Sequence, residues 1–156
     1  MSAIAGAKPG SFSRKTNFRA VELFTRIPLV AFTVILTMIA FRYMANPVHA
    51  AAAAGIAFTS PGGITVARVG FAGFPLAFAA FFTECLFSER RILFGLRTEL
   101  MLLGIVMGVR VFGMLLAHSA ESARLLIPET AMAFLCVFAI RLEINRRKRE
   151  QVQSVA

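Results

Sequence analysis

Four runs of apolar residues, each flanked by charged or turn-forming residues, dominate the pattern of this 156-residue chain. A membrane whose hydrocarbon core is about 30 Å thick is crossed by roughly 20 residues of apolar α-helix. Because the runs are close to this length, we predict an all-α protein, an integral membrane four-helix bundle. The four predicted helices span about residues 27–43, 65–87, 100–116 and 125–142.

Composition supports a lipid environment for these helices. Hydrophobic residues make up 58% of the chain and charged residues only 16%, whereas a soluble domain is nearer half apolar and about one quarter charged. A soluble fold of this length could not hide so much apolar surface. We therefore expect lipid, not water, to surround the predicted helices.

The segments outside the apolar runs are more polar. Within residues 1–26, residues 1–11 contain Gly6, Pro9, Gly10 and Ser11, small or turn-forming residues that predict disorder. Basic residues among Phe and Leu then predict either an interfacial amphipathic helix or a plain juxtamembrane segment. Residues 27–142 form the four-helix membrane domain, and residues 143–156 form a basic cytoplasmic tail. Alternatively, the first apolar run is a signal peptide cleaved near residues 48–50, which would leave three helices.

Basic residues are distributed unevenly about the four runs. Of the 17 Lys and Arg residues, all except Arg42, Arg68, Arg110 and Arg124 lie in the N-terminal segment, in the 89–99 connection or at the C-terminal end from Arg141 onward. Because cytoplasmic loops are enriched in Lys and Arg, this predicts that both termini are cytoplasmic. The formal net charge of +9 comes from these flanks, a distribution typical of contact with anionic lipid headgroups and not of nucleic-acid binding.

Three of the charged residues inside the predicted helices, Arg68, Arg110 and Glu129, lie in the outer half of the membrane. From the helical rise of 1.5 Å per residue, Arg68 lies about one turn below the outer face, Arg110 about 10 Å below it and Glu129 about 6 Å below it. Arg42 and His118 lie at the rim of the same face. A charge at the centre of a membrane helix costs roughly 2.5–3.5 kcal/mol, so such residues tend to be paired or functional. We predict that these five residues form one outer cluster.

Two roles are open for this outer cluster. Glu129 can accept two hydrogen bonds from one arginine, because a guanidinium matches a carboxylate in shape. One Glu cannot neutralise two arginines, so the remaining positive charge could receive an anionic ligand such as a lipid headgroup or a carboxylate. The alternative is a structural clamp between helices, in which the second arginine reaches water.

Glycines and a proline indicate how the helices pack. Gly104 and Gly108 form a G-x-x-x-G pair in the third helix, and Gly70 and Gly73 lie together in the second. Small residues at such spacings let two helices approach closely. Pro75 should kink the second helix, which is tolerated where neighbouring helices satisfy the freed carbonyl.

No combination of residues predicts catalysis, a metal site or a cofactor. Cys85 and Cys136 lie in apolar runs and form neither a zinc signature nor a C-x-x-C pair, so we interpret them as small buried hydrophobes. Glu84, near the inner end of the second helix, either relays protons or, as we prefer, reaches the interface or pairs with Arg90 or Arg91.

Short motifs along residues 27–142 resemble those of a known family. They are residues 43–47, Gly55 with Ile56, Arg68 with Gly70 and Gly73, Arg110 with Gly113, and Pro128 with Glu129. In these the chain resembles the domain of unknown function 4345 family of small bacterial membrane proteins. The resemblance implies a four-helix domain in a bacterial inner membrane and no established activity. That family often has Gly-Arg where Val109 and Arg110 stand, and a short Asp-Gly loop where His118 and Ser119 stand.

Three classes of function remain open. The first is a non-enzymatic membrane module that binds a lipid, a small anion or a membrane partner through the outer cluster. The second is a small transporter or channel, which would need a homo-oligomer because four helices with few polar faces cannot line a pore alone. The third is a membrane enzyme acting on a lipid or quinone, with Glu129 and His118 as its candidate proton donors. We favour the first, with membrane lipids or a membrane protein as partner and no nucleic acid.

Overall fold

A computed structural model of the chain describes residues 11–118 and 122–155. These residues form helices and loops without any strand, which confirms the all-α prediction. The elements in chain order are α1 (Ser11–Ala45), α2 (Pro47–Ala52), α3 (Pro61–Arg68), the π-helix η1 (Val69–Gly73), α4 (Phe74–Leu86), α5 (Ile92–Ala117) and α6 (Ala123–Val155). Disorder was predicted for residues 1–11, of which residues 1–10 lie outside the described residues and Ser11 begins α1.

Four stretches of helix are long and apolar enough to cross a membrane. They are Leu23–Ala45, Pro61–Leu86, Ile92–Ala117 and Ala123–Val152. Their number and order agree with the four predicted runs, and they indicate a multi-pass membrane protein. The observed helices are longer than predicted: α1 begins at residue 11, α5 at residue 92, and α6 continues to residue 155. The prediction ended helices where charges began, but Arg, Glu and Lys are themselves good helix formers.

The start of the second spanning helix was mispredicted. Pro61, Gly62 and Gly63 form the first turn of α3 instead of a loop. The hydroxyl of Ser60 accepts a hydrogen bond from the Gly63 N–H at 3.2 Å, and Pro61 fills the first helical position, where an N–H would lack a partner. The local sequence thus carries an N-cap signal that the apolar pattern alone does not show.

Pro75 is accommodated by the π-helix η1. A proline removes one helical hydrogen bond, and its ring crowds the carbonyl four residues earlier, here that of Phe71. Residues 69–73 adopt π-helical geometry directly before this proline, and one extra residue in the turn relieves such crowding. The chain continues through η1 into α4 as one spanning helix.

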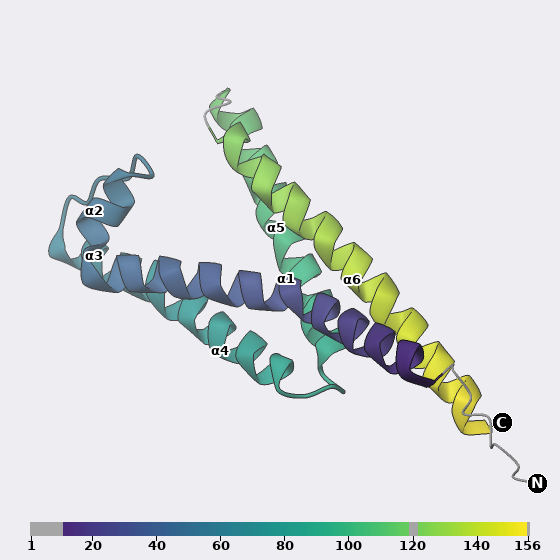
Figure 1. The fold of residues 1–156 in the computed structure, drawn as a ribbon. Helices are drawn as coiled ribbons and strands as arrows, with labels where there is room; N and C mark the ends of the chain where they lie inside the picture. Colours follow the sequence, from purple (N-terminus) through teal and green to yellow (C-terminus); the bar gives the residue numbers. More distant parts are fainter. Residues whose placement is uncertain (1–10, 119–121, 156) are drawn as a thin grey trace, which may run out of the picture.

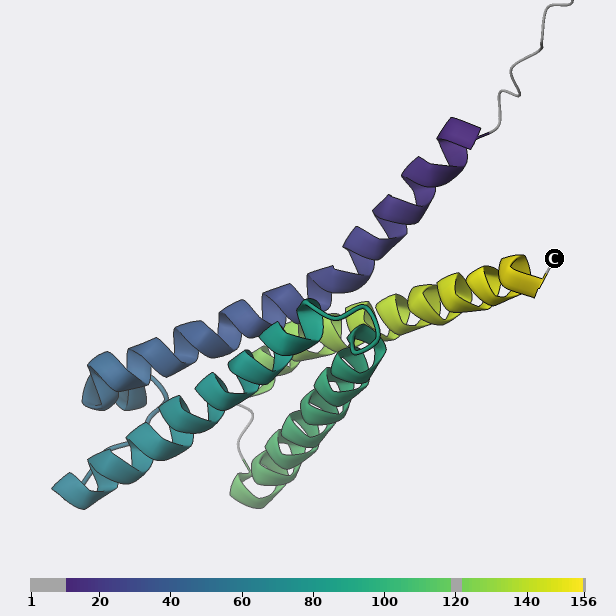
Figure 2. The ribbon, with the colours of Figure 1, turned by 90° about the horizontal axis from the view of Figure 1, so that it is seen from below.

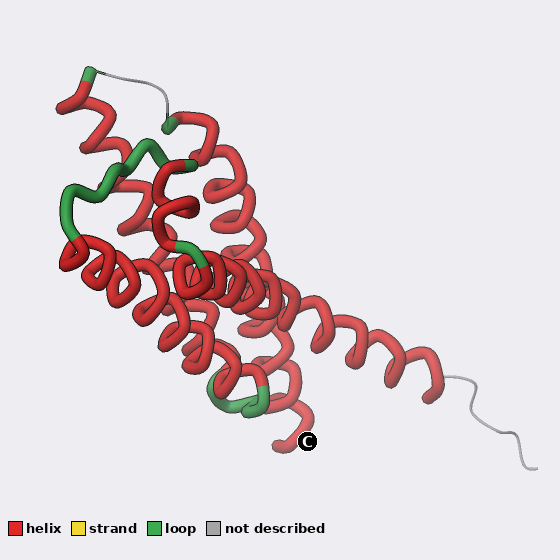
Figure 3. The backbone as a smooth tube through the Cα atoms, turned by 90° about the vertical axis from the view of Figure 1, so that its left-hand side faces the viewer, coloured by secondary structure: helices red, strands yellow, loops and turns green. Residues whose placement is uncertain are grey.

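The four spanning helices form two hairpins that meet at one end (Figures 1 and 2). One hairpin pairs α1 with α3, η1 and α4, and the other pairs α5 with α6. Near the connection between α4 and α5, α1 also contacts α5 and α6; we call this the packed end. Towards the opposite, open end the hairpins diverge, and α3 contacts neither α5 nor α6. In Figure 3, the loop between α2 and α3 lies at this open end, together with the last turn of α5 and the first turn of α6.

The apolar core lies at the packed end and takes residues from all four spanning helices. Its fully buried members are Leu29, Phe82, Ile92, Leu96 and Ala139. The Phe32 ring packs edge-on against Phe82, with ring centroids 5.4 Å apart. Burial against other parts of the protein is therefore concentrated where the hairpins cross, and most of the remaining apolar surface faces outward.

Close helix approach occurs at a glycine that the sequence analysis did not single out. A Cβ on Gly95 would lie 2.9 Å from the Cβ of Cys85 and 3.2 Å from Cδ2 of Leu29. The four glycines named from the sequence are Gly70, Gly73, Gly104 and Gly108, and a Cβ at any of them would meet nothing within 4 Å. They therefore do not mediate close helix packing within the described chain, although η1 as a whole contacts α1.

Candidate functional site

The open end of the α5–α6 hairpin contains an ion pair of Glu129 with one arginine, as predicted, and the arginine is Arg110. Arg110 on α5 donates from Nε to Glu129 Oε2 at 3.1 Å and from Nη2 to Glu129 Oε1 at 2.6 Å. The contact is the two-pronged arrangement in which both carboxylate oxygens accept from one guanidinium. It forms because α5 and α6 are antiparallel neighbours, which brings together residues 19 positions apart.

The pair of Arg110 and Glu129 is mostly, but not fully, buried. The Arg110 side chain is 22% exposed and the Glu129 side chain 17%. A guanidinium has five N–H groups, and the pair uses two of them. Three donors of Arg110 therefore remain for water or a ligand, while the two unit charges cancel.

The outer cluster as a whole does not form. Arg68 ends α3 on the other hairpin, is exposed, and has no partner among the described residues, because α3 contacts neither α5 nor α6. Arg42 is likewise exposed, near the end of α1. The predicted excess positive charge beside Glu129 is therefore absent. The error came from taking equal depth in the membrane as proximity, which diverging hairpins do not provide.

His118 has a structural role at the end of α5. It adopts a left-handed conformation with φ 47° and ψ 36°, and its N–H donates to the carbonyl of Met114. Such a residue terminates a helix and reverses the chain. The side chain is exposed and no contact with Arg110 or Glu129 is present, which weakens its candidacy as a proton donor.

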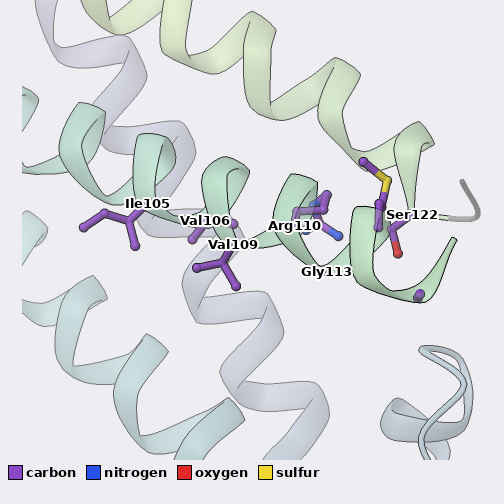
Figure 4. A pocket seen from close by; sticks show the side chains of 8 residues that line it. Ile105, Val106, Val109, Arg110, Gly113 and Ser122 are labelled. Carbon is purple, nitrogen blue, oxygen red and sulfur yellow. The ribbon is translucent and has the colours of Figure 1, made fainter. Parts of the chain in front are cut away.

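A hollow of about 590 Å³ runs along α5 beside Arg110 (Figure 4). The part of the hollow nearer the packed end is apolar and includes Ile105, Val106 and Val109. Arg110 and Ser122 supply polar groups towards the open end. Gly113 lies in the same wall, and its missing side chain leaves the hollow open. The size falls within the range of small-molecule sites, roughly 300–1,000 Å³.

A second hollow, of about 340 Å³, lies between α4 and α5 nearer the packed end. Four phenylalanines line it, together with one small and one polar residue: Phe74, Phe78, Phe81, Phe94, Ala77 and Thr98. Thr98 donates its hydroxyl hydrogen to the Phe94 carbonyl at 3.0 Å, so it presents an acceptor oxygen. Thr98 and Ile105 are seven residues apart on α5, which places the Ile105 end of the first hollow on the same face of that helix as Thr98.

The packed end holds a buried polar network that the sequence analysis missed. The fully buried Glu143 accepts from Arg146 Nη2 at 3.0 Å and from Arg147 Nε at 2.9 Å. Arg147 also donates to the backbone carbonyl of Glu89 at 2.7 Å, so α6 is tied to the connection between α4 and α5. The i, i+3 and i, i+4 spacing of these residues was a visible signal, but the segment was interpreted as a solvated tail.

Glu84 and Arg91 form an exposed ion pair at the same end. This confirms the preferred interpretation of Glu84. Cys85 and Cys136 are both buried free thiols, as predicted. Within the described residues no group of three or more His, Cys, Asp or Glu side chains could hold a metal ion.

A second buried carboxyl, that of Glu99 on α5, was not identified from the sequence. Its side chain is fully buried, and neither oxygen has a hydrogen-bond partner of ordinary geometry. The thiol of Cys136 on α6 interacts with it. The sequence predicts Glu99 in a charged connection, because the third helix is expected to begin only at residue 100.

Comparisons with known proteins supply no relative from which a role could be transferred. No family model, no curated protein and no solved structure matches this chain. The functional interpretation therefore depends on the arrangement of the residues described above.

Proposed function

We propose that this chain is a non-enzymatic membrane module that binds an amphiphilic, lipid-like molecule along α5. The polar head would contact Arg110 and Ser122, and the apolar chain would follow Ile105 and Val109 towards the hollow at Phe94. The observation that carries this proposal is the position of Arg110. It lies in the wall of a ligand-sized hollow with three N–H donors unused by its carboxylate partner.

The dimensions of the two hollows suit one extended chain. Thr98 and Arg110 are separated by twelve residues of α5, which is about 18 Å along the helix axis. One leaflet of a bilayer contributes roughly half of a 30 Å hydrocarbon core. An acyl or isoprenoid chain anchored at Arg110 therefore has the length to reach the phenylalanines of the second hollow.

The neutral Arg110–Glu129 pair indicates how the head would be recognised. Because Glu129 cancels the charge of Arg110, a ligand gains hydrogen bonds from the guanidinium but no net Coulomb attraction. Headgroups with acceptor oxygens, such as phosphodiesters or esters, fit this chemistry, and a zwitterionic head fits better than a bare anion. This replaces the expectation of a small anion, which depended on Arg68 standing nearby.

The same pairing counts against an enzyme. A general acid or base must be able to exchange a proton with its substrate, whereas both oxygens of Glu129 accept from Arg110. The transporter alternative would need a second copy beside the uncontacted Gly104 and Gly108.

The proposed setting is the inner membrane of a bacterium, with both termini in the cytoplasm. The first turn of α1 and the last turn of α6 lie at the same end of the molecule (Figure 1), as an even number of spans requires. The basic residues that flank the packed end support a cytoplasmic location for it. The bacterial assignment rests on the family resemblance.

Native mass spectrometry of the full chain in mild detergent tests the binding proposal. The wild type should carry a co-purifying lipid-sized adduct. Arg110→Leu should lose most of it, whereas the matched control Arg68→Leu should keep it, since Arg68 is a membrane arginine outside the hollow. Retention of the adduct by Arg110→Leu, or absence of any adduct from a folded wild type incubated with mixed phospholipids, would refute the proposal.

A further inference from the structure

Two carboxyls are buried at the packed half of the α5–α6 hairpin, and they differ in their partners. Glu143 accepts hydrogen bonds from two arginines. Glu99 is equally buried, yet neither of its oxygens has a hydrogen-bond partner of ordinary geometry, and the one side chain that interacts with it is the thiol of Cys136. Glu99 lines neither hollow along α5, so lipid binding as proposed above does not explain it.

No described side chain forms an ion pair with Glu99. The charged or titratable groups that the described parts of α1, α4 and α6 bring to the packed end include Arg26, Cys85, Cys136, Glu143 and Arg146. Arg26 donates to the carbonyl of Leu86 at 3.4 Å, and no described cation forms an ion pair with Glu99. Cys136 is the group that interacts with the Glu99 carboxyl.

The protonation state follows from these surroundings. An ionised carboxylate that is cut off from water costs many kcal/mol unless it is paired or hydrogen-bonded. The neutral acid is far less costly to bury, and its O–H can donate to a thiol sulfur, which is a weak acceptor. An ionisable residue held inside a membrane-spanning segment is also, by default, a candidate for function.

We propose that Glu99 and Cys136 form a proton-binding site between α5 and α6, with the proton held on Glu99 and directed at the sulfur of Cys136. The ligand is a proton, and loss of it to water converts the carboxylic acid to a carboxylate without any change at the thiol. The resulting buried anion has no partner, so release of the proton requires the α5–α6 contact to open and admit water. Proton binding and closure of this contact are therefore coupled.

Infrared spectroscopy of the full-length protein in lipid nanodiscs tests this site at neutral pH. The difference spectrum of wild type minus Glu99→Gln should contain the carbonyl stretch of a protonated carboxylic acid. The control Glu84→Gln removes an exposed, ion-paired carboxylate and should leave that band in place. If Glu99→Gln instead removes a carboxylate stretch, the site holds no proton and the proposal fails.

The stability of Glu99→Gln and the acid band of a second variant, Cys136→Ala, test the site further. Gln is the neutral isostere of protonated Glu, so Glu99→Gln should fold with wild-type stability, and its failure to fold would count against a neutral Glu99. Cys136→Ala should keep the acid band but shift it to higher frequency, because the hydrogen bond to sulfur is gone. An unshifted band in that variant would exclude Cys136 from the site.

Discussion

The two ends of the α5–α6 hairpin use the same chemistry for different purposes. At the packed end, Glu143 is fully buried, accepts from two arginines, and one of these also holds the connection between α4 and α5. At the open end, Glu129 has a single arginine partner, and that arginine faces a hollow with unused donors. An arginine whose N–H groups donate to other groups of the protein stabilises the fold. An arginine whose N–H groups face a cavity without a partner is available to a ligand.

The largest effect should come from Glu143→Ala. Removing one side of a buried ion pair costs about 3–5 kcal/mol, because the remaining charges stay partly desolvated. We expect a loss of about 3 kcal/mol in the free energy of unfolding, measured by denaturant titration in detergent micelles. The control Glu150→Ala removes a half-exposed partner 3.8 Å from Arg146 and should change stability by less than about 1 kcal/mol. Equal losses in the two variants would mean that the packed end is not the stable part.

Gly95→Leu should rank next. Its Cβ would sit 2.9 Å from the Cβ of Cys85, and forcing atoms into a packed helix crossing typically costs about 1–3 kcal/mol. We expect a loss of about 2 kcal/mol in the same titration. Gly104→Leu is the matched control at the open end, where no atom lies within 4 Å of the added Cβ. A loss in Gly104→Leu as large as in Gly95→Leu would show that a second copy of the chain occupies the space beside Gly104.

The difference between the packed end and the open end also explains which features could be predicted from the sequence. The spanning helices and the pairs Arg110–Glu129 and Glu84–Arg91 were predictable, because they depend on hydropathy and on residues near in sequence or depth. The separation of Arg68 from that site was not, since it depends on the angle between two hairpins.

The burial of Glu99 and Glu143 was hidden for a related reason. Both residues lie in stretches rich in charge, where the sequence favours a connection or a solvated tail. Only the crossing of α1, α5 and α6 at the packed end removes these two side chains from solvent. The i, i+4 spacing of Glu143 and Arg147 signals their pairing, but the burial of the two carboxyls is a property of the three-dimensional packing and is not signalled by the local sequence.

A smaller effect, on binding and not on folding, should follow from Glu129→Gln. The amide removes the negative charge beside Arg110 and leaves the hollow with a net positive group. If the hollow binds a headgroup, the variant should shift its preference towards anionic over zwitterionic phospholipid by about tenfold, which corresponds to about 1.4 kcal/mol. Adduct ratios in native mass spectra, recorded with equimolar lipid mixtures, measure the shift. An unchanged ratio would separate Arg110 from headgroup recognition even if a lipid binds.

The smallest effect should appear locally, at the open end of the other hairpin. Ser60→Ala removes the hydroxyl that caps α3, and loss of such a cap costs about 1 kcal/mol. Because α3 packs only within its own hairpin, this loss should fray its first turn without unfolding the packed end. Amide hydrogen exchange at residues 62–64 should therefore accelerate about fivefold, the equivalent of that free energy, while exchange at residues 92–96 stays unchanged. Thr59→Ala, which removes a neighbouring hydroxyl, serves as the control. Faster exchange at both ends would mean that the two hairpins open together, and the distinction between a stable packed end and an adaptable open end would no longer hold.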